Sequence, residues 1–468
     1  MSAGMDAIPA RNASGISGLW NLTLGDIRGE AGAIALLIPL LLAATFWNGF
    51  PLIYYDTGAY VFEGLGGHFM VERSPVYSLF LRYAGAGASL WFAAVIQAAA
   101  TAFVVTQCAR AEIPRLRMAT LAVVGASLVV VTGLPWYVGQ IEPDCFTALV
   151  VLAICLLAFR ANRLGRVRAI VLVGIGGFAA AAHPSHLLLA GFLVILIVAT
   201  RGVVGIAHRW PKPRVLGSAF VCILGLALIV GANFQFTRQI FVSRAGASFV
   251  FARMLQDGIV MRLLDDTCPK SGYRLCAYRD SLPPTADGWL WTPDSPFFTL
   301  GHFTGTAAES ERIVRDAILR YPSLQLKAAI GDAATQFARF RTGDQIEPQE
   351  WVLYPVLARY LPGQMRAYLA ARQQRGEIDF RVMGSLHVIV GALSLIGLVL
   401  FLGFAISRRR DRRIVLPGFV LAALVGNAII CGVLSGPHDR YQSRLIWLAP
   451  FALMISLRPS CRVDDHVT

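Results

Sequence analysis

Long apolar runs separated by short connectors are the feature that most constrains how this chain folds. A helix needs about 20 apolar residues to cross a bilayer, and lipid admits only helices and closed barrels because every backbone polar group must be paired. The runs are continuous rather than alternating, which favours helices. Ten runs fit this description: 31–50, 88–108, 118–135, 145–160, 168–182, 186–201, 215–236, 383–406, 414–435 and 444–457. We therefore predict an all-α polytopic membrane protein with about ten transmembrane helices.

The connectors between these runs differ in charge. Every second connector is rich in basic residues, and these four connectors fall on one side of the membrane when ten spans are counted. Their members are Arg110, Arg115, Arg117, Arg160, Arg163, Arg166, Arg168, Arg201, Arg209, Lys212, Arg214, Arg408, Arg409, Arg410, Arg412 and Arg413. Short cytoplasmic loops carry an excess of Lys and Arg. This side is therefore predicted to be cytoplasmic, with both termini, and the expected location is the bacterial inner (plasma) membrane.

Composition favours a membrane protein over a nucleic-acid-binding protein. The 468 residues are 56% hydrophobic, and the formal net charge is +14. A strongly basic chain can bind nucleic acid, but here the arginines lie in connectors, where the positive-inside rule accounts for them. The expected partners are therefore membrane lipids and not nucleic acid.

Five regions follow from this pattern. Residues 1–30 are expected to be a cytoplasmic tail, because they contain acids and no cleavage site of a secretory signal. The other regions are a transmembrane module of about seven helices at 31–236, a mainly helical, soluble external (periplasmic) domain at 237–382, about three C-terminal transmembrane helices at 383–457 and a cytoplasmic tail at 458–468. The external segment 51–87 is expected to hold two helices at the membrane surface, one of them opened by Pro75.

Acidic residues on the external side are candidates for catalysis. Asp56 follows the first run, in FPLIYYDTGAY. A partly desolvated carboxylate beside tyrosines suits a general base, although Asp is also a common N-cap. Glu142 and Asp144 lie in the next external connector, WYVGQIEPDCF. A second acid near Asp56 would suit an acid/base pair or a divalent metal, and the alternative for Asp144 is again a helix cap.

Two histidines mark the third external connector. His183 and His186 stand three residues apart in AAHPSHLLL, at the mouth of a predicted helical hairpin. Histidines in this position could bind a phosphate or a metal. The alternative is that they only pack at the membrane interface.

Arginines on the external side are candidates for binding an anion. His438, Arg440 and Arg444 crowd the last external connector, SGPHDRYQSRL, and Arg73 belongs to the same class. Arginine here opposes the positive-inside bias, and the guanidinium group is well shaped for phosphate. The alternative is an ion pair of Arg440 with Asp439 or of Arg444 with Glu142.

Two cysteines of the predicted external domain are candidates for a disulfide. Cys268 and Cys276 flank the stretch CPKSGYRLC, and an oxidising compartment favours disulfides. The alternative is a pair of free thiols. A zinc site is not expected, because no second close pair of ligands lies nearby.

Other functional classes are judged by what they require. No Walker loop, GxGxxG, HExxH or GxSxG motif precedes a suitable helix, which leaves nucleotide-driven chemistry without support. A transporter needs ionisable residues and broken helices within the spans, whereas the polar groups here gather at one face. The alternatives left open are a polysaccharide polymerase or ligase, a transporter or flippase of lipid-linked glycans, and a non-catalytic assembly protein.

The layout of residues 31–240 resembles the GT-C superfamily of integral-membrane glycosyltransferases, in particular the protein mannosyltransferases and the lipid A aminoarabinose transferases. Such enzymes place an acid in the first external loop, where Asp56 stands, and follow it with two juxtamembrane helices, where 57–70 and 74–86 stand. The run Arg73-Ser74-Pro75-Val76-Tyr77 is similar to their stretch of arginine, proline and tyrosine. The adjacent Asp-Glu pair of several members is Asp56-Thr57 here.

The resemblance extends to the second external loop and implies a reaction. Glu142 and Asp144 match the second acid of the family. The implied substrate is a polyprenyl-phosphate sugar, whose sugar moves to a lipid, glycan or protein acceptor on the external face. The implied roles are a general base for Asp56 and phosphate binding for the external histidines and arginines. No cofactor is assigned with certainty, and a divalent metal is a possible one.

Overall fold

The computed structural model describes residues 24–114, 116–207, 212–407 and 412–457, and its regular elements there are helices. Six of the described helical segments are long and apolar enough to cross a membrane. They are α1 (Leu24–Leu41) continued by α2 (Ala43–Asn48), α5 (Leu90–Glu112), α10 (Pro184–Ala207), α11 (Val215–Thr237), α20 (Phe380–Ser407) and α21 (Val415–Leu434). A polytopic α-helical membrane protein is thereby confirmed.

The other predicted runs form shorter helices within the same bundle. These are α6 (Met118–Val131), α8 (Cys145–Phe159), α9 (Arg166–Ala181) and α23 (Leu448–Ser456). Helix α8 is apolar all round and is buried along nearly its whole length, as expected for a helix surrounded by other helices. It packs against α5, α9, α10 and α11. Ten membrane spans remain a prediction, because these four helices are shorter than a usual span.

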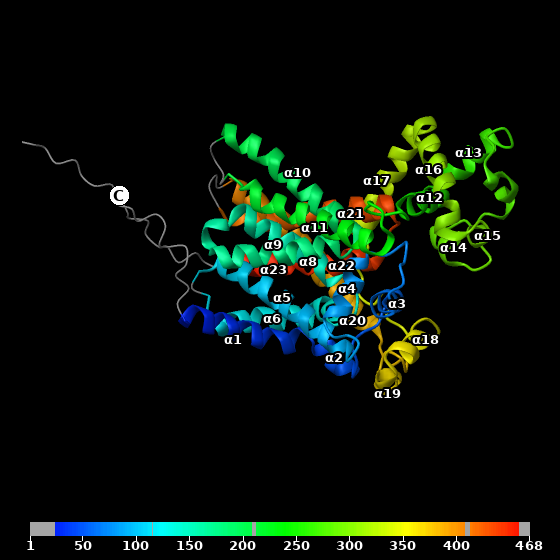
Figure 1. Ribbon diagram of the computed structural model, residues 1–468. Coiled ribbons are helices and arrows are strands. Elements are labelled where there is room, and N and C mark those ends of the chain that lie inside the picture. Colours follow the sequence, from blue (N-terminus) through cyan, green and yellow to red (C-terminus); the bar gives the residue numbers. More distant parts are fainter. Residues whose placement is uncertain (1–23, 115, 208–211, 408–411, 458–468) are drawn as a thin grey trace, which may run out of the picture.

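The end of α5 and the connector between α8 and α9 lie at one end of the bundle, to the left in Figure 1. Arg160 forms an ion pair of 2.8 Å with Glu112, and Arg168 forms one of 2.7 Å with Glu30 near the start of α1. Arg163 donates a hydrogen bond of 2.5 Å to the carbonyl of Ala111. The connectors after α5 and α8 therefore lie side by side. The predicted tails lie mostly outside the described residues, and α1 begins at Leu24, inside the predicted N-terminal tail.

The opposite end of the bundle carries segment 237–382, which forms two separate parts (Figure 1). The first part, here named the roof subdomain, comprises α12 (Gly246–Gln256), α13 (Ile259–Thr267), α14 (Ala286–Trp291), α15 (Pro296–Thr299) and α16 (His302–Arg320). It has its own core, which includes Phe251, Trp289 and Phe297. A disulfide joins Cys268 to Cys276, with their Cα atoms 5.7 Å apart.

The second part returns to the bundle. Helix α17 (Pro322–Ala338) packs along α21, and α18 (Glu350–Tyr360) packs against α3 (Thr57–Gly66). After α19 (Met365–Leu369), the side chain of Gln373 accepts a hydrogen bond of 3.0 Å from the backbone of Ile53 and donates one of 2.6 Å to its carbonyl. This part of the predicted external domain is therefore continuous with the core of the bundle.

Helices α3 and α4 (Pro75–Tyr83) are the two helices expected in 51–87, and they form a hairpin. They touch closely, because a Cβ atom on Gly64 would stand 2.3 Å from the carbonyl oxygen of Ser78. The buried carboxyl of Glu63 accepts hydrogen bonds of 2.5 Å from the Ser78 hydroxyl and 2.9 Å from the Met70 backbone N–H. Burial raises the pKa of Glu63 to about 7. The hairpin therefore contains an acid that titrates near neutral pH.

This raised pKa predicts a dependence of stability on pH. The folded state holds the Glu63 proton up to about pH 7, whereas the unfolded state releases it near the usual value. The stabilising contribution is thus full below the usual pKa and is lost as pH rises through about 7. We expect Glu63→Gln to flatten the fall in melting temperature between about pH 5 and pH 8. Equal slopes for wild type and variant would contradict this, and Glu377→Gln, at an exposed acid, is the control.

Candidate active site

A cavity of about 610 Å³ lies between the bundle and the roof subdomain. One wall is apolar and is formed by the ends of α10 and α21, including Leu187, Leu188 and Leu434. Leu188 is 48% exposed and Leu434 is 37% exposed, so this wall presents apolar side chains that the protein does not cover. The opposite side is polar and contains Asp56, Glu72, Arg73, His183, His438 and Arg440. The cavity therefore joins an apolar wall to a group of charged side chains.

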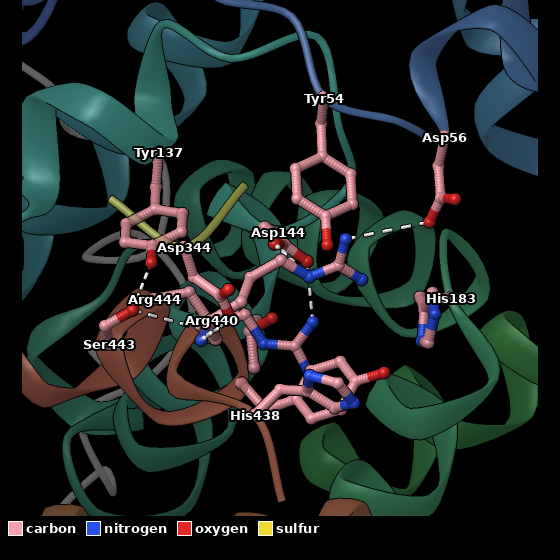
Figure 2. A network of polar contacts seen from close by, with 12 residues as sticks. Tyr54, Asp56, Tyr137, Asp144, His183, Asp344, His438, Arg440, Ser443 and Arg444 are labelled. Carbon is pink, nitrogen blue, oxygen red and sulfur yellow. Dashed lines mark hydrogen bonds and ion pairs between the residues drawn. The ribbon is translucent and has the colours of Figure 1, made fainter. Parts of the chain in front are cut away.

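Asp56 holds the N-cap position of α3, but its side chain makes no capping hydrogen bond. Instead the carboxylate accepts a hydrogen bond of 2.5 Å from Arg73 and lies 3.6 Å from a guanidinium nitrogen of Arg440. The neighbouring Thr57 makes the local bonds, since its hydroxyl accepts from the backbone N–H of Tyr54 at 2.9 Å. Asp56 is thereby left to face the cavity and its arginines (Figure 2).

Backbone bonds bring the first two external connectors together. The Leu52 N–H donates to the carbonyl of Gly139 at 3.0 Å, and the Ile141 N–H donates to the Leu52 carbonyl at 2.9 Å. The Thr57 hydroxyl also donates to the Ile141 carbonyl at 3.0 Å. These contacts place Asp56 beside the segment that carries Glu142 and Asp144.

Asp144 links the two arginines of α22 (Asp439–Ile446). Its carboxylate accepts a hydrogen bond of 2.6 Å from Arg444 and lies 3.3 Å from Nε of Arg440. Asp144 and Arg444 are fully buried. Like Asp56, Asp144 stands at a helix N-cap without a side-chain capping bond. A continuous network of alternating charge therefore runs from Asp56 through Arg440 and Asp144 to Arg444 (Figure 2).

Glu142 and Asp144 are two residues apart, but their surroundings shift their pKa values in opposite directions. Burial raises the pKa of Glu142 well above its usual value, and the nearby charge of Asp56 raises it further. Burial also acts to raise the pKa of Asp144, but Arg440 and Arg444 together lower it. The Oε1 atom of Glu142 has no hydrogen-bond partner among the described residues. The surroundings therefore favour the protonated form of Glu142 and the ionised form of Asp144.

Arg440 is held in place by groups beyond the predicted ones. Its guanidinium lies 4.1 Å from the ring centroid of Tyr54, a cation–π contact. Its backbone N–H donates a hydrogen bond of 3.1 Å to Asp344. Since Asp344 lies in the segment between α17 and α18, the part of 237–382 that returns to the bundle also positions this arginine.

The three predicted histidines occupy different environments. His183 and His438 line the cavity. His186 is fully buried, where its Nε2 lies 2.6 Å from the Thr147 hydroxyl and its Nδ1 lies 3.0 Å from the carbonyl of Ala179. His186 therefore packs inside the bundle, whereas the other two are available to a ligand in the cavity.

Several residues of the cavity were not expected from the sequence. They are Trp291, Asp287 and Phe249 of the roof subdomain and Gln345 and Glu347 of the returning segment. They come from parts of the chain that were predicted to form a separate domain, and no local motif distinguishes them from ordinary surface residues.

The acids of the site are engaged by arginines rather than grouped for a metal. Asp56 and Asp144 each pair with two guanidinium groups. Within residues 24–457, apart from the gaps in the description, no three His, Cys, Asp or Glu side chains are placed together to hold a metal ion. The divalent metal therefore stays a prediction.

Comparisons with protein-family models, with curated proteins and with solved structures find no match for this chain.

Proposed function

We propose that the chain is a membrane glycosyltransferase of the GT-C type, which transfers a sugar from a polyprenyl-phosphate donor to an acceptor at the external face of the membrane. The observation that carries this proposal is the cavity itself. It joins an apolar wall on α10 and α21 to a polar group in which Asp56 lies beside Arg73 and Arg440. A lipid-borne anion is the ligand whose two chemical halves match these two surfaces.

The arginines suit the phosphate of such a donor. Arg73 and Arg440 line the cavity and share the carboxylate of Asp56. Guanidinium groups bind phosphate through paired, charge-assisted hydrogen bonds. A bound phosphate would therefore compete with Asp56 for these arginines and would leave the carboxylate free for its chemical role. His183 and His438 stand on the same cavity surface and would extend the phosphate site.

In the proposed step, Asp56 accepts the proton of an acceptor hydroxyl. The oxygen attacks the anomeric carbon of the donor sugar, a new C–O bond forms, and the bond between that carbon and the phosphate oxygen breaks with inversion. The polyprenyl phosphate departs with the bonding electrons, and Arg73 and Arg440 stabilise its charge. Asp144 positions Arg440 and Arg444 without touching the substrate.

The proposal includes an orientation. The end of the bundle that carries Arg160, Arg163 and Arg168 would be cytoplasmic according to the positive-inside rule, and the cavity at the opposite end would be external. The disulfide between Cys268 and Cys276 agrees with an oxidising compartment on that side. The bacterial inner membrane is the location that combines these features.

Binding of decaprenyl phosphate to the purified protein in phospholipid nanodiscs tests the proposal. We expect it to bind more tightly than uncharged decaprenol, because only the phosphate engages the arginines. Arg73→Gln should weaken decaprenyl phosphate binding by about tenfold and leave decaprenol binding unchanged. Arg279→Gln, at an exposed arginine of the roof subdomain, is the matched control. Equal binding of both lipids by the wild type would contradict the proposal.

A further inference from the structure

The roof subdomain supplies the wall of the cavity that faces the charged network. Asp287, Leu290 and Trp291 of α14 line the cavity, together with Phe249 and Val250 of α12. Leu290 is buried, and the neighbouring Trp289 is fully buried in the roof core. This anchoring leaves Asp287 and Trp291, which are four residues apart and share a helix face, directed at the cavity.

Two contacts connect this wall to the charged side chains of the cavity. The guanidinium of Arg73 lies 5.7 Å from the centroid of the Trp291 ring. His438 lies 3.8 Å from the carboxylate of Asp287 across the cavity. The Trp291 ring also packs against two rings of the roof subdomain, since its centroid lies 6.3 Å from that of Phe249 and 6.0 Å from that of Phe303. A ligand group next to the arginine would therefore meet the indole ring and this carboxylate together.

From this juxtaposition we infer that Trp291 and Asp287 form a sugar-binding subsite, which holds the pyranose ring of the donor against the roof subdomain. The C–H groups of one sugar face pack on the electron-rich face of an aromatic ring, and hydroxyl groups at the ring edge donate to a carboxylate. Few precisely placed polar groups beside an aromatic surface are typical of small-ligand sites.

The nearness of Arg73 assigns this subsite to the donor rather than to the acceptor. In a polyprenyl-phosphate sugar, the ring is bonded directly to the phosphate. A ring beside the arginine that binds the phosphate is therefore the ring to be transferred. This inference rests on the proposed function for its phosphate site, and it adds that the roof subdomain selects which sugar is transferred.

Saturation-transfer NMR on the full chain in phospholipid nanodiscs tests the subsite. The probes are the 1-phosphates of glucose, mannose, galactose and N-acetylglucosamine, with inorganic phosphate for comparison. We expect at least one sugar 1-phosphate to bind more tightly than inorganic phosphate. Trp291→Ala should weaken that probe by about tenfold or more, while Trp291→Phe retains most of the affinity.

Asp287→Asn is a second test of the subsite that should keep the protein folded. The Asp287 side chain is 59% exposed, so its replacement should not disturb the roof core. It should weaken the same probe severalfold and leave inorganic phosphate unaffected. Phe298→Ala, at a ring of the roof subdomain that is 40% exposed and outside the cavity lining, is the control.

The outcomes separate the subsite from the proposed function. If both roof variants bind every sugar 1-phosphate as the wild type does, or if no sugar 1-phosphate exceeds inorganic phosphate, the subsite is overturned, while binding of decaprenyl phosphate still supports the phosphate site. If sugar 1-phosphates bind through Trp291 but decaprenyl phosphate does not bind in preference to decaprenol, the sugar subsite stands and the lipid-linked donor is wrong.

Discussion

Asp56→Asn should abolish sugar transfer while leaving the protein folded in the membrane. The variant keeps the size of the side chain but cannot accept the proton of the acceptor hydroxyl, so we expect a loss of at least about 10²-fold in rate. The measurement is transfer of radiolabelled sugar from lipid-linked donors in membranes that contain the chain. Asp265→Asn, at an acid of the roof subdomain whose side chain is 48% exposed, is the control.

A second measurement separates the role of a base from a structural role. In the wild type, Asp56 competes with phosphate for Arg73 and Arg440, which it contacts at 2.5 and 3.6 Å. The Asp56→Asn protein should therefore bind decaprenyl phosphate at least as tightly as the wild type. Full transfer activity in this variant would contradict the role of Asp56 as general base. Loss of both binding and activity would indicate a structural role for Asp56 instead.

Asp144→Asn should cause the largest loss of stability of any single change in the network. It removes the carboxylate that pairs with Arg444 at 2.6 Å, and Arg444 is fully buried. No other carboxylate pairs with Arg444 in the part of the chain that the structure describes. Breaking a buried pair from one side costs about 3–5 kcal/mol, because a buried charge is left without a partner. Thermal unfolding of the purified protein in detergent would measure this loss.

The opposite half of the pair provides the matched control. Arg444→Met removes the other charge but leaves Asp144 beside Arg440, 3.3 Å away. We therefore expect Arg444→Met to lower the melting temperature less than Asp144→Asn does. Equal losses, or the reverse order, would show that Arg440 does not compensate for Arg444.

The helical membrane fold could be predicted because it depends on local sequence. Each apolar run needs only its own residues to signal a helix, so all ten predicted runs coincide with helices. The division of 237–382 into two parts could not be predicted in this way. Leu353 and Leu357 complete the core of the bundle, but they lie in a short helix of mixed composition, and nothing in the nearby sequence says which distant surface covers them.

The residues of the candidate site also differ in whether local sequence is enough to predict them. Asp56, Arg73 and Arg440 were predicted from residue type and from their place beside apolar runs, and the structure brings them together. His186 has the same sequence signal as His183, yet it points into the bundle, because rotation about a helix axis cannot be judged without the neighbouring helices. Asp287 and Trp291 could not be predicted because their approach to Arg73 depends on how the whole roof subdomain is placed.

The bonds between Ile53 and Gln373 bear on the order of events during synthesis. The connector that carries Asp56 is hydrogen-bonded to Gln373, which lies 320 positions after Ile53 in the sequence. Arg440 is synthesised later still. Contacts so distant along the chain form late, since the intervening loop must close first. The first membrane helices would thus enter the bilayer long before the residues of the candidate site meet. The candidate site would therefore be assembled only in the completed protein.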